Sequence, residues 1–557
     1  MPTHRPRSRR LVRTILLALL AALALPLAAV AADGYEHHAL VRFWLEAEAD
    51  QQTFAENQSE WDVAAGRAGR WADIVVPRSE LADMLALGSR VDVLHDDLEA
   101  HYAERFAGRA DYGLYHTFAE GVAWLDELAT LYPEVVSPKW SLGWSHEGRN
   151  IWCVRVSDNP AVHEPEEPEI LFDAAIHARE VMSAEMVLML TAHLAEQYAA
   201  GDPEIVALLD ENAVYMVPYS NPDGWVYNEQ TNPNGGGMWR KNRRVNGDGS
   251  HGVDCNRNYP YEWGCAGGSS GTPSAETYRG PSPGSEPETQ ALMQLINQHD
   301  FVVRQSYHTY SDLTLYPWGY TTADTPDHAT FVEMAAAMVQ YNGYTPGQPP
   351  EVLYEVCGGS FDWDYGQQDE HTRIFAFTNE IGSTGFWPGD AERQGLFDEN
   401  LWPALYLIAV AGDLRGPSFA HDPVPFQIPG AGAQTVTTTV EGFGGAAIDP
   451  ASVTLSWRVD GGPWTDQPLA PTGQPGEFGG TIPQQLGHPV VVEYYLSASD
   501  EFGHDGTAPR GAPDVLFTYE IRDGFDHAME ADRGWRAGDP ADDASSGLWV
   551  RVDPVGT

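Results

Sequence analysis

The chain has 557 residues, of which 43% are hydrophobic and 11% aromatic, and its formal net charge is -48 at pH 7. This length is typical of several domains, and the apolar content is high enough for packed cores, so a globally disordered chain is excluded. The acidic charge would repel nucleic acids and anionic membranes, which we exclude as partners. A solvated acidic surface accounts for this charge, and calcium binding by some acidic loops is the alternative interpretation.

The first 32 residues have the pattern of an export signal. Five arginines between Arg5 and Arg13 precede an apolar stretch from Ile15 to about Val30, and small residues end at Ala32. This pattern predicts a signal peptide that is removed, with a retained anchor as the alternative. Since no later segment is long and apolar enough to span a bilayer, we expect a secreted protein, or a periplasmic or cell-surface one, without a membrane span after signal removal.

Residues 33–109 form the next region. Alternating segments at 38–44 and 71–76 predict strands, and helix-like stretches lie between and after them. A small α+β unit that follows a signal and precedes a larger region is typical of a propeptide. Arg105 and Arg109 are the sites at which it could be cleaved.

Residues 110–415 alternate strand-like and helix-like patterns, which predicts an α/β fold with a mixed twisted sheet flanked by helices. Thr117 and Glu120 have the spacing of a capping box at the start of a helix. Ser183 is expected to cap a helix over about 184–199. Buried strands are expected at 170–172, 213–217, 302–303 and 374–377.

Residues 416–523 change character, because Pro and Gly punctuate short alternating runs. This pattern predicts an immunoglobulin-like β-sandwich, which could bind a cell surface or polymer or act as a passive spacer. Residues 524–557 resemble the start of a further, incomplete β module. The sandwich strands are expected at 435–440, 453–459, 490–496 and 515–521.

The chain has four cysteines, Cys153, Cys255, Cys265 and Cys357. In an exported protein such cysteines can pair, and the proximity of Cys255 and Cys265 in a Gly-rich stretch makes them the expected disulfide. No C-x-x-C pair is present, so a zinc site made of cysteines is not expected.

Polar residues follow or end three of the predicted strands. His177 and Glu180 come just after one strand, His308 ends a second and Glu380 ends a third. In an open α/β sheet, ligands bind at the carboxyl ends of the strands. Imidazole and carboxylate donors suit a catalytic zinc ion, and a carboxylate that does not bind the metal suits the role of general base.

A basic cluster, Trp239–Arg244, and the pair Asn256 and Arg257 lie between these ligands in the sequence. A solvated loop or a processing site is the alternative interpretation of the basic cluster. Because arginine recognises carboxylates in a bidentate manner, an arginine near the metal indicates an anionic substrate end.

Over roughly 112–412 the sequence resembles the zinc carboxypeptidase family typified by carboxypeptidase A. The motifs that carry the resemblance occur in the family's order and spacing. They are His177-x-x-Glu180, Trp239-Arg240-Lys241-Asn242-Arg243, Gly252-Val253-Asp254-Cys255-Asn256-Arg257-Asn258, Glu276-Thr277-Tyr278-Arg279-Gly280, His308-Thr309-Tyr310, Tyr316-Pro317-Trp318-Gly319-Tyr320 and Tyr354-x-x-x-Gly358-Gly359-Ser360-Phe361-Asp362-Trp363.

The resemblance implies one Zn²⁺ per catalytic domain, bound by His177, Glu180 and His308. It implies that Glu380 deprotonates the zinc-bound water and then passes the proton to the leaving amine. It also implies that Arg240 stabilises the oxyanion of the tetrahedral intermediate.

The same resemblance implies that Asn256, Arg257 and Tyr354 clamp the free carboxylate of peptide or protein C-termini. Arg179 would help to bind the substrate, and Asp254 would orient the first histidine ligand. Such a clamp makes the enzyme an exopeptidase, because an internal residue has no carboxylate to satisfy it.

Phe361 lies at the pocket position where family members that remove Lys or Arg have an acidic residue, and Gly319, at a second pocket position, is also uncharged. Neutral or apolar C-terminal residues are therefore the expected products. Glu351, Glu355 and Asp364, in the same stretch of the sequence, leave a basic preference open.

Two alternatives to this function are a cell-wall peptide hydrolase of the same fold and an inactive surface-binding protein. The presence of Asn256, Arg257 and Tyr354 together counts against the first. The presence of all the expected ligands and of Glu380 counts against the second.

Overall fold

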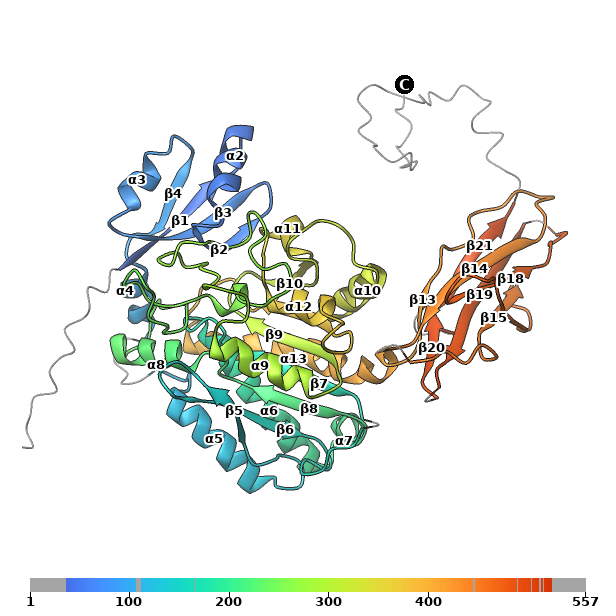
Figure 1. Cartoon of the computed structure of the whole chain (residues 1–557), viewed down its shortest axis with the longest axis horizontal. Helices are drawn as coiled ribbons and strands as arrows, with labels where there is room; N and C mark the ends of the chain where they lie inside the picture. Colours follow the sequence, from blue (N-terminus) through green and yellow to red (C-terminus); the bar gives the residue numbers. More distant parts are fainter. Residues whose placement is uncertain are drawn as a thin grey trace, which may run out of the picture.

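The computed structural model describes residues 37–522 apart from 107–111, 166, 444–445, 488, 502, 510–511 and 514. The expected signal peptide (1–32) and the expected incomplete module (524–557) therefore lie outside the described residues. An α+β unit, a large α/β unit and an all-β unit, which extends to one side, follow one another along the chain (Figure 1). Within the part of the chain described, no helix combines the length and apolarity needed to cross a bilayer.

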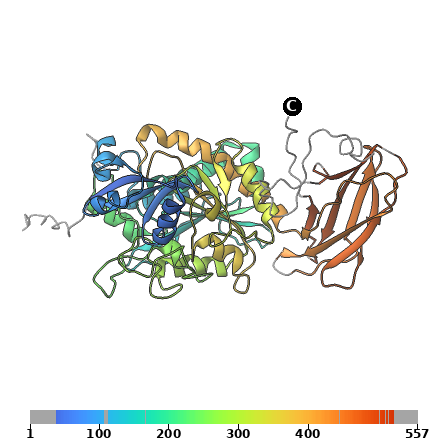
Figure 2. The same cartoon turned by 90° about the horizontal axis from the view of Figure 1, so that it is seen from above.

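The N-terminal unit is an antiparallel sheet with the strand order β2-β3-β1-β4, which confirms the expected small α+β unit. Val41, Phe43 and Ile74 belong to its own apolar core, whereas Leu98 and Tyr102 join the core of the next unit. Seen from above, it lies over the α/β unit (Figure 2). Its elements are β1 (His38–Trp44), α2 (Glu48–Asn57), β2 (Asp62–Arg67), β3 (Trp71–Pro77), α3 (Leu81–Leu85), β4 (Val91–His95) and α4 (Leu98–Arg105).

The α/β unit is built on an eight-stranded mixed sheet with the order β11-β10-β12-β9-β7-β8-β6-β5. Its central strands β8, β7, β9 and β12 run parallel, so their carboxyl ends meet at one edge of the sheet. The strands are β5 (Trp140–Trp144), β6 (Asn150–Val156), β7 (Glu169–Ala174), β8 (Ala213–Val217), β9 (Phe301–His308), β10 (Leu313–Leu315), β11 (Thr345–Gly347) and β12 (Phe375–Glu380).

Helices cover both faces of this sheet. Side chains of a strand alternate between faces, so Ile170 and Phe172 of β7 pack with α5, α6, α10 and α13, whereas Leu171 packs with α9 and α12. The helices are α5 (Phe118–Leu131), α6 (Val181–Ala200), α7 (Pro203–Asp210), α8 (Pro222–Thr231), the 3-10 turn η1 (Cys255–Arg257), α9 (Pro287–Asn297), α10 (His328–Met338), α11 (Pro349–Val352), α12 (Ser360–Gly366) and α13 (Asp390–Leu414).

The capping box of Thr117 and Glu120 is confirmed at the start of α5. The expected cap at Ser183 is wrong, because α6 begins two residues earlier, at Val181. The Ser183 hydroxyl instead donates to the Glu180 carbonyl at 2.5 Å and accepts from the Ala175 amide at 3.1 Å. Ser183 therefore fastens the first turn of α6 to the end of β7.

The C-terminal unit has two antiparallel sheets around an apolar core, as expected for a β-sandwich. One sheet has the order β13-β14-β18-β17, and the other has the order β16-β15-β19-β20 with β21 also paired to β19. The strands are β13 (Ser418–Ala420), β14 (Gln434–Glu441), β15 (Thr454–Val459), β16 (Thr465–Pro468), β17 (Ala470–Pro471), β18 (Glu477–Ile482), β19 (Val490–Ser499), β20 (Asp505–Ala508) and β21 (Phe517–Ile521).

The expected Cys255–Cys265 disulfide is wrong. Cys265 pairs with Cys357, 92 residues away in the sequence, while Cys153 and Cys255 are free and buried. Cys255 lies in η1 and packs into the core beneath α9, where burial raises the pKa of its thiol well above the usual range. Its side chain is thus part of the core, and Cys265 links its loop to the loop that follows Tyr354.

Candidate functional site

The candidate site lies where the parallel strands β7, β9 and β12 end. His308 is the last residue of β9 and Glu380 the last residue of β12, and the two are paired across the sheet. His177 and Glu180 follow β7 in the turn that leads into α6. The structure therefore brings together the four residues that the strand-end pattern singled out.

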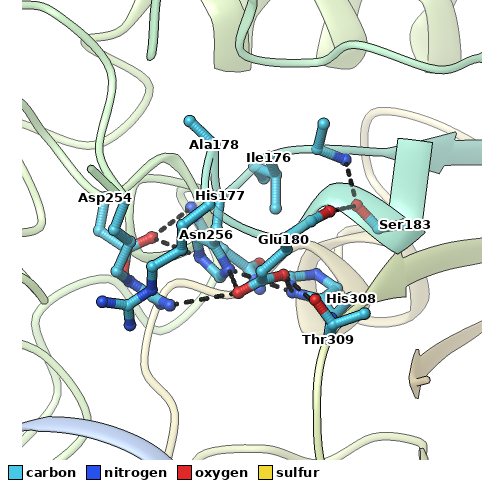
Figure 3. Close-up of polar contacts among 12 residues, drawn as sticks. Ile176, His177, Ala178, Glu180, Ser183, Asp254, Asn256, His308 and Thr309 are labelled. Carbon is cyan, nitrogen blue, oxygen red and sulfur yellow. Dashed lines mark hydrogen bonds and ion pairs between the residues drawn. The ribbon is translucent and has the colours of Figure 1, made fainter. Parts of the chain in front are cut away.

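His177, Glu180 and His308 form a tight buried cluster (Figure 3). His177 Nδ1 lies 2.9 Å from Glu180 Oε1, and His308 Nδ1 lies 3.1 Å from Glu180 Oε2. The two Nδ1 atoms lie 3.1 Å apart. Each of the three residues is at most 3% exposed, so the cluster is shielded from bulk solvent.

This cluster fits a zinc ion. A tetrahedral zinc ion with bonds of about 2.1 Å holds its ligand atoms about 3.4 Å apart, close to the separations seen here. Two imidazole nitrogens and a carboxylate oxygen are a donor set that zinc prefers. Burial and the nearby Arg240 charge lower the pKa of His177, whereas the contact with Glu180 outweighs burial and raises the pKa of His308.

Asp254 contacts one member of the cluster, His177, and the neighbouring Arg240. Its Oδ1 lies 3.2 Å from His177 Nε2, and its Oδ2 accepts from Arg240 Nη2 at 2.9 Å. Asp254 is fully buried and also accepts from the Asn256 amide at 2.9 Å, which caps η1. One carboxylate thus orients His177 and Arg240 together.

Arg257 gives the cavity a buried positive charge that makes no direct ion pair within the described residues. It is 2% exposed, and within the described residues no carboxylate forms an ion pair with it. Its Nη1 donates only to the Asn256 carbonyl, at 2.9 Å. A guanidinium without a direct ion pair keeps donors free for a carboxylate, so this wall of the cavity is suited to an anionic ligand. Asn256, Arg240 and Tyr354 line the same cavity.

Glu380 faces this cavity too. Burial raises the pKa of Glu380 to about 8, with His308 opposing the shift and Glu180 adding to it. A carboxylate with a raised pKa is a better proton acceptor than an ordinary one, as general-base catalysis requires.

Phe361 lines the cavity from the first turn of α12. Its ring packs against Gly319, where an added Cβ would lie 2.8 Å from Phe361 Cζ. The acidic residues nearby face elsewhere: Asp362 accepts from the Gly319 amide at 2.9 Å, and Asp364 pairs with Arg304 at 2.9 Å. Glu351 and Glu355, the other acidic residues of this stretch, do not line the cavity.

The N-terminal unit closes the cavity. Val63 and Ala64 of β2 are part of its lining, and the Val63 carbonyl accepts a hydrogen bond from the Tyr354 hydroxyl at 3.4 Å. Asp62 accepts two hydrogen bonds from Arg179, at 2.5 and 2.6 Å. A space of about 30 Å³ remains, which is enough for a few waters and too small for an amino-acid side chain.

Sequence reasoning did not single out two residues that contact Arg179. Asp62 is one of many acidic residues in the chain, and no motif marks it. The Phe386 ring lies 4.1 Å from the Arg179 guanidinium and lines the cavity. Only the tertiary structure brings these residues to Arg179.

The chain matches known proteins over this unit. The family described as zinc carboxypeptidase matches residues 121–400. Carboxypeptidase A1 of Bos taurus is 30% identical over 388 residues, which cover 64% of this chain and 89% of that protein. A zinc carboxypeptidase of Saccharothrix mutabilis subsp. capreolus is 33% identical over 357 residues, which cover 59% of this chain and 79% of that protein.

Among solved structures, the carboxypeptidase A from Helicoverpa armigera shares the fold with a TM-score of 0.58 at 23% identity, covering 68% of this chain and 98% of that chain. Thrombin activatable fibrinolysis inhibitor shares it with a TM-score of 0.57, also at 23% identity, covering 68% of this chain and 99% of that chain. The chain belongs to the zinc carboxypeptidase family and is a metallocarboxypeptidase, a hydrolase.

Proposed function

We propose that this protein is exported as a latent zinc carboxypeptidase, which removes neutral or apolar residues from the C-termini of peptides or proteins once its N-terminal unit has been released. The observation that carries the proposal is the meeting of two features in one cavity. The first is the cluster of His177, Glu180 and His308, and the second is the unpaired, buried Arg257.

His177, Glu180 and His308 would hold the zinc ion. When bound, zinc supplies a Lewis acid that polarises a carbonyl and lowers the pKa of a water molecule. Asp254 keeps the His177 ring in place through Nε2, which leaves Nδ1 directed at the other two ligands.

Glu380 is the proposed general base. It takes a proton from the attacking water and delivers it to the leaving amine, a role supported by its position at the end of β12, paired with His308 and facing the cavity. Arg240 is the proposed electrostatic partner of the oxyanion that develops on the scissile carbonyl, and its contact with Asp254 holds it in position.

Arg257, Asn256 and Tyr354 are proposed to bind the terminal carboxylate of the substrate, with Arg179 as a further substrate contact. A substrate carboxylate would form the direct ion pair that Arg257 lacks within the described residues. An internal peptide bond offers no such group, so this wall favours exopeptidase action.

The preference for neutral residues rests on Phe361 and its surroundings. Phe361 presents an aromatic ring where a charged partner for Lys or Arg would be needed. Asp362 accepts a hydrogen bond from the Gly319 amide, and the carboxylate of Asp364 forms an ion pair with Arg304.

The unit formed by residues 33–109 is proposed to be an inhibitory propeptide. Val63 and Ala64 occupy space that a substrate would need, and Asp62 forms an ion pair with Arg179. Of the two expected cleavage sites, Arg105 ends α4 and donates to the Thr384 and Trp387 carbonyls, at 3.1 and 2.9 Å. The second site, Arg109, lies outside the described residues.

The test is a panel of blocked dipeptides with varied C-terminal residues, assayed before and after limited proteolysis. We expect hydrolysis to be weak before proteolysis and much faster after it, with neutral residues preferred and with C-terminal amides resistant. A chelator should abolish the activity and added zinc should restore it. Equal hydrolysis of acids and amides would contradict the carboxylate site, and full activity of metal-free protein would contradict the zinc mechanism.

A further inference from the structure

We propose that the chain has a second metal site, for zinc or a similar divalent transition ion, formed by Glu169, His299 and His163. It lies at the opposite end of the sheet from the cavity described above. Glu169 is the first residue of β7, and His299 comes two residues before β9. Because β9 spans eight residues, the two sites are about 25 Å apart. The second site is thus distinct from the catalytic cluster.

Two of the three separations between the ligand atoms are close to those around a tetrahedral ion. His299 Nδ1 lies 2.9 Å from Glu169 Oε1, and His163 Nδ1 lies 3.4 Å from the same oxygen. The three ligand atoms all lie within 4.8 Å of one another. A tetrahedral zinc ion holds ligand atoms about 3.4 Å apart, and two imidazoles with one carboxylate repeat the donor set of the catalytic cluster.

The Glu169 carboxylate is fixed in place by groups that would not bind the metal. The Tyr215 hydroxyl donates to Oε1 at 2.7 Å, and the Asp300 amide donates to Oε2 at 3.0 Å. Such contacts orient the ligands of metal sites.

Arginines distinguish this cluster from two similar ones. In the cluster of His146, Glu286 and Glu288, Arg244 pairs with Glu286 at 2.9 Å, so a cation is already present. In the cluster of His37, Asp97 and Glu99, Arg78 pairs with Asp97 at 2.9 Å. Within the described residues, neither arginine nor lysine pairs with Glu169, whose ion-pair partners are the two histidines.

The surroundings admit a cation and attract it. The His163 side chain is 58% exposed, and His299 lines a cleft of about 740 Å³. The charged residues of that cleft are mainly acidic, so the local potential favours cations. They are Asp300, Asp369, Glu370, Arg373 and Glu441.

The test counts metal ions in the full chain. After zinc loading and dialysis, we expect two zinc ions per chain by elemental analysis. H163A/H299A should hold one and, after limited proteolysis, should keep its peptidase activity. H177A/H308A should also hold one and should be inactive. H193A, at a histidine of α6 outside these clusters, serves as the control and should hold two.

A second readout separates binding from folding. Cobalt added to H177A/H308A should give visible absorption of a tetrahedral site, and the further changes H163A and H299A should remove it while the circular dichroism spectrum is unchanged. One zinc ion per wild-type chain, or two per chain in H163A/H299A, would overturn the second site. If the wild-type chain holds one zinc ion and H177A/H308A holds none, the second site is refuted, but the proposed catalytic function still stands.

Discussion

Asp62 and Arg179 form a buried bidentate ion pair across two units of the chain, with Oδ2 2.5 Å from Nη1 and Oδ1 2.6 Å from Nη2. Arg179 is 1% exposed and lies between two of the proposed zinc ligands, His177 and Glu180. A carboxylate of the N-terminal unit therefore pairs with a guanidinium beside the cluster of His177, Glu180 and His308. In the proposed function, release of the N-terminal unit would break this pair and free Arg179 for the substrate.

The first prediction concerns latency. D62N removes the charge of the pair and leaves the shape of β2 unchanged, so the uncleaved chain should become more active. A hydrogen bond to a charged group contributes about 1.5 to 3 kcal/mol, which corresponds to a rise of about 10- to 100-fold in the kcat/KM of uncleaved protein.

The control for this variant is D73N. Asp73 makes a similar bidentate pair with Arg42, at 2.7 and 2.9 Å, within the sheet of the same unit. It should leave the kcat/KM of the uncleaved chain unchanged. Equal latency of D62N and wild type would remove the ion pair from the inhibitory mechanism.

The second prediction is a dependence of latency on pH. Burial opposes ionisation of Asp62, but Arg179 lowers its pKa below the usual 3.8. A carboxylate with a lowered pKa stabilises the closed form fully above about 3.8, and this stabilisation is lost as the pH falls through the lowered value. The N-terminal unit should therefore loosen in strong acid and stay closed at neutral pH.

Pulsed proteolysis of the N-terminal unit at stepped pH measures this effect. Wild type should become susceptible as the pH falls below about 3.8, whereas D62N should lack this component of the acid response. Identical acid responses of wild type and D62N would assign the loosening to other groups.

Much of the site could be predicted from the sequence, because local rules determine where its functional side chains lie. His308 and Glu380 end apolar strands, and parallel strands bring their carboxyl ends together. Thr117 and Glu120 form a capping box within one turn, so sequence spacing alone determines their contact.

The wrong and missing predictions involve contacts between distant segments. Cys255 and Cys265 are neighbours in the sequence, yet η1 directs Cys255 into the core and Cys265 pairs with Cys357. Asp62 reaches Arg179 across 117 residues. Such contacts depend on how whole units pack, which residue patterns do not encode locally.

The third prediction concerns the C-terminal residue of the substrate. After limited proteolysis, the wild-type enzyme should prefer C-terminal Leu or Phe to Lys by about 10- to 200-fold in kcat/KM, because a hydrophobic pocket discriminates by about 1 to 3 kcal/mol. F361D should shift this ratio towards Lys, because a carboxylate then faces the ammonium group. The ratio of kcat/KM between the two substrates does not depend on the amount of active enzyme. An unchanged ratio in F361D would show that Phe361 lies outside the specificity pocket.

The last prediction concerns Glu380. E380Q keeps the shape of the side chain and removes its ability to accept a proton, so kcat should fall by about 100- to 10,000-fold. His177, Glu180 and His308 are unchanged, so the zinc content of the catalytic cluster should equal that of wild type. E399Q, at an exposed residue of α13, is the control and should have normal activity. A near-normal rate for E380Q at full zinc occupancy would exclude Glu380 as the general base, whereas loss of zinc together with activity would show that it supports the metal site.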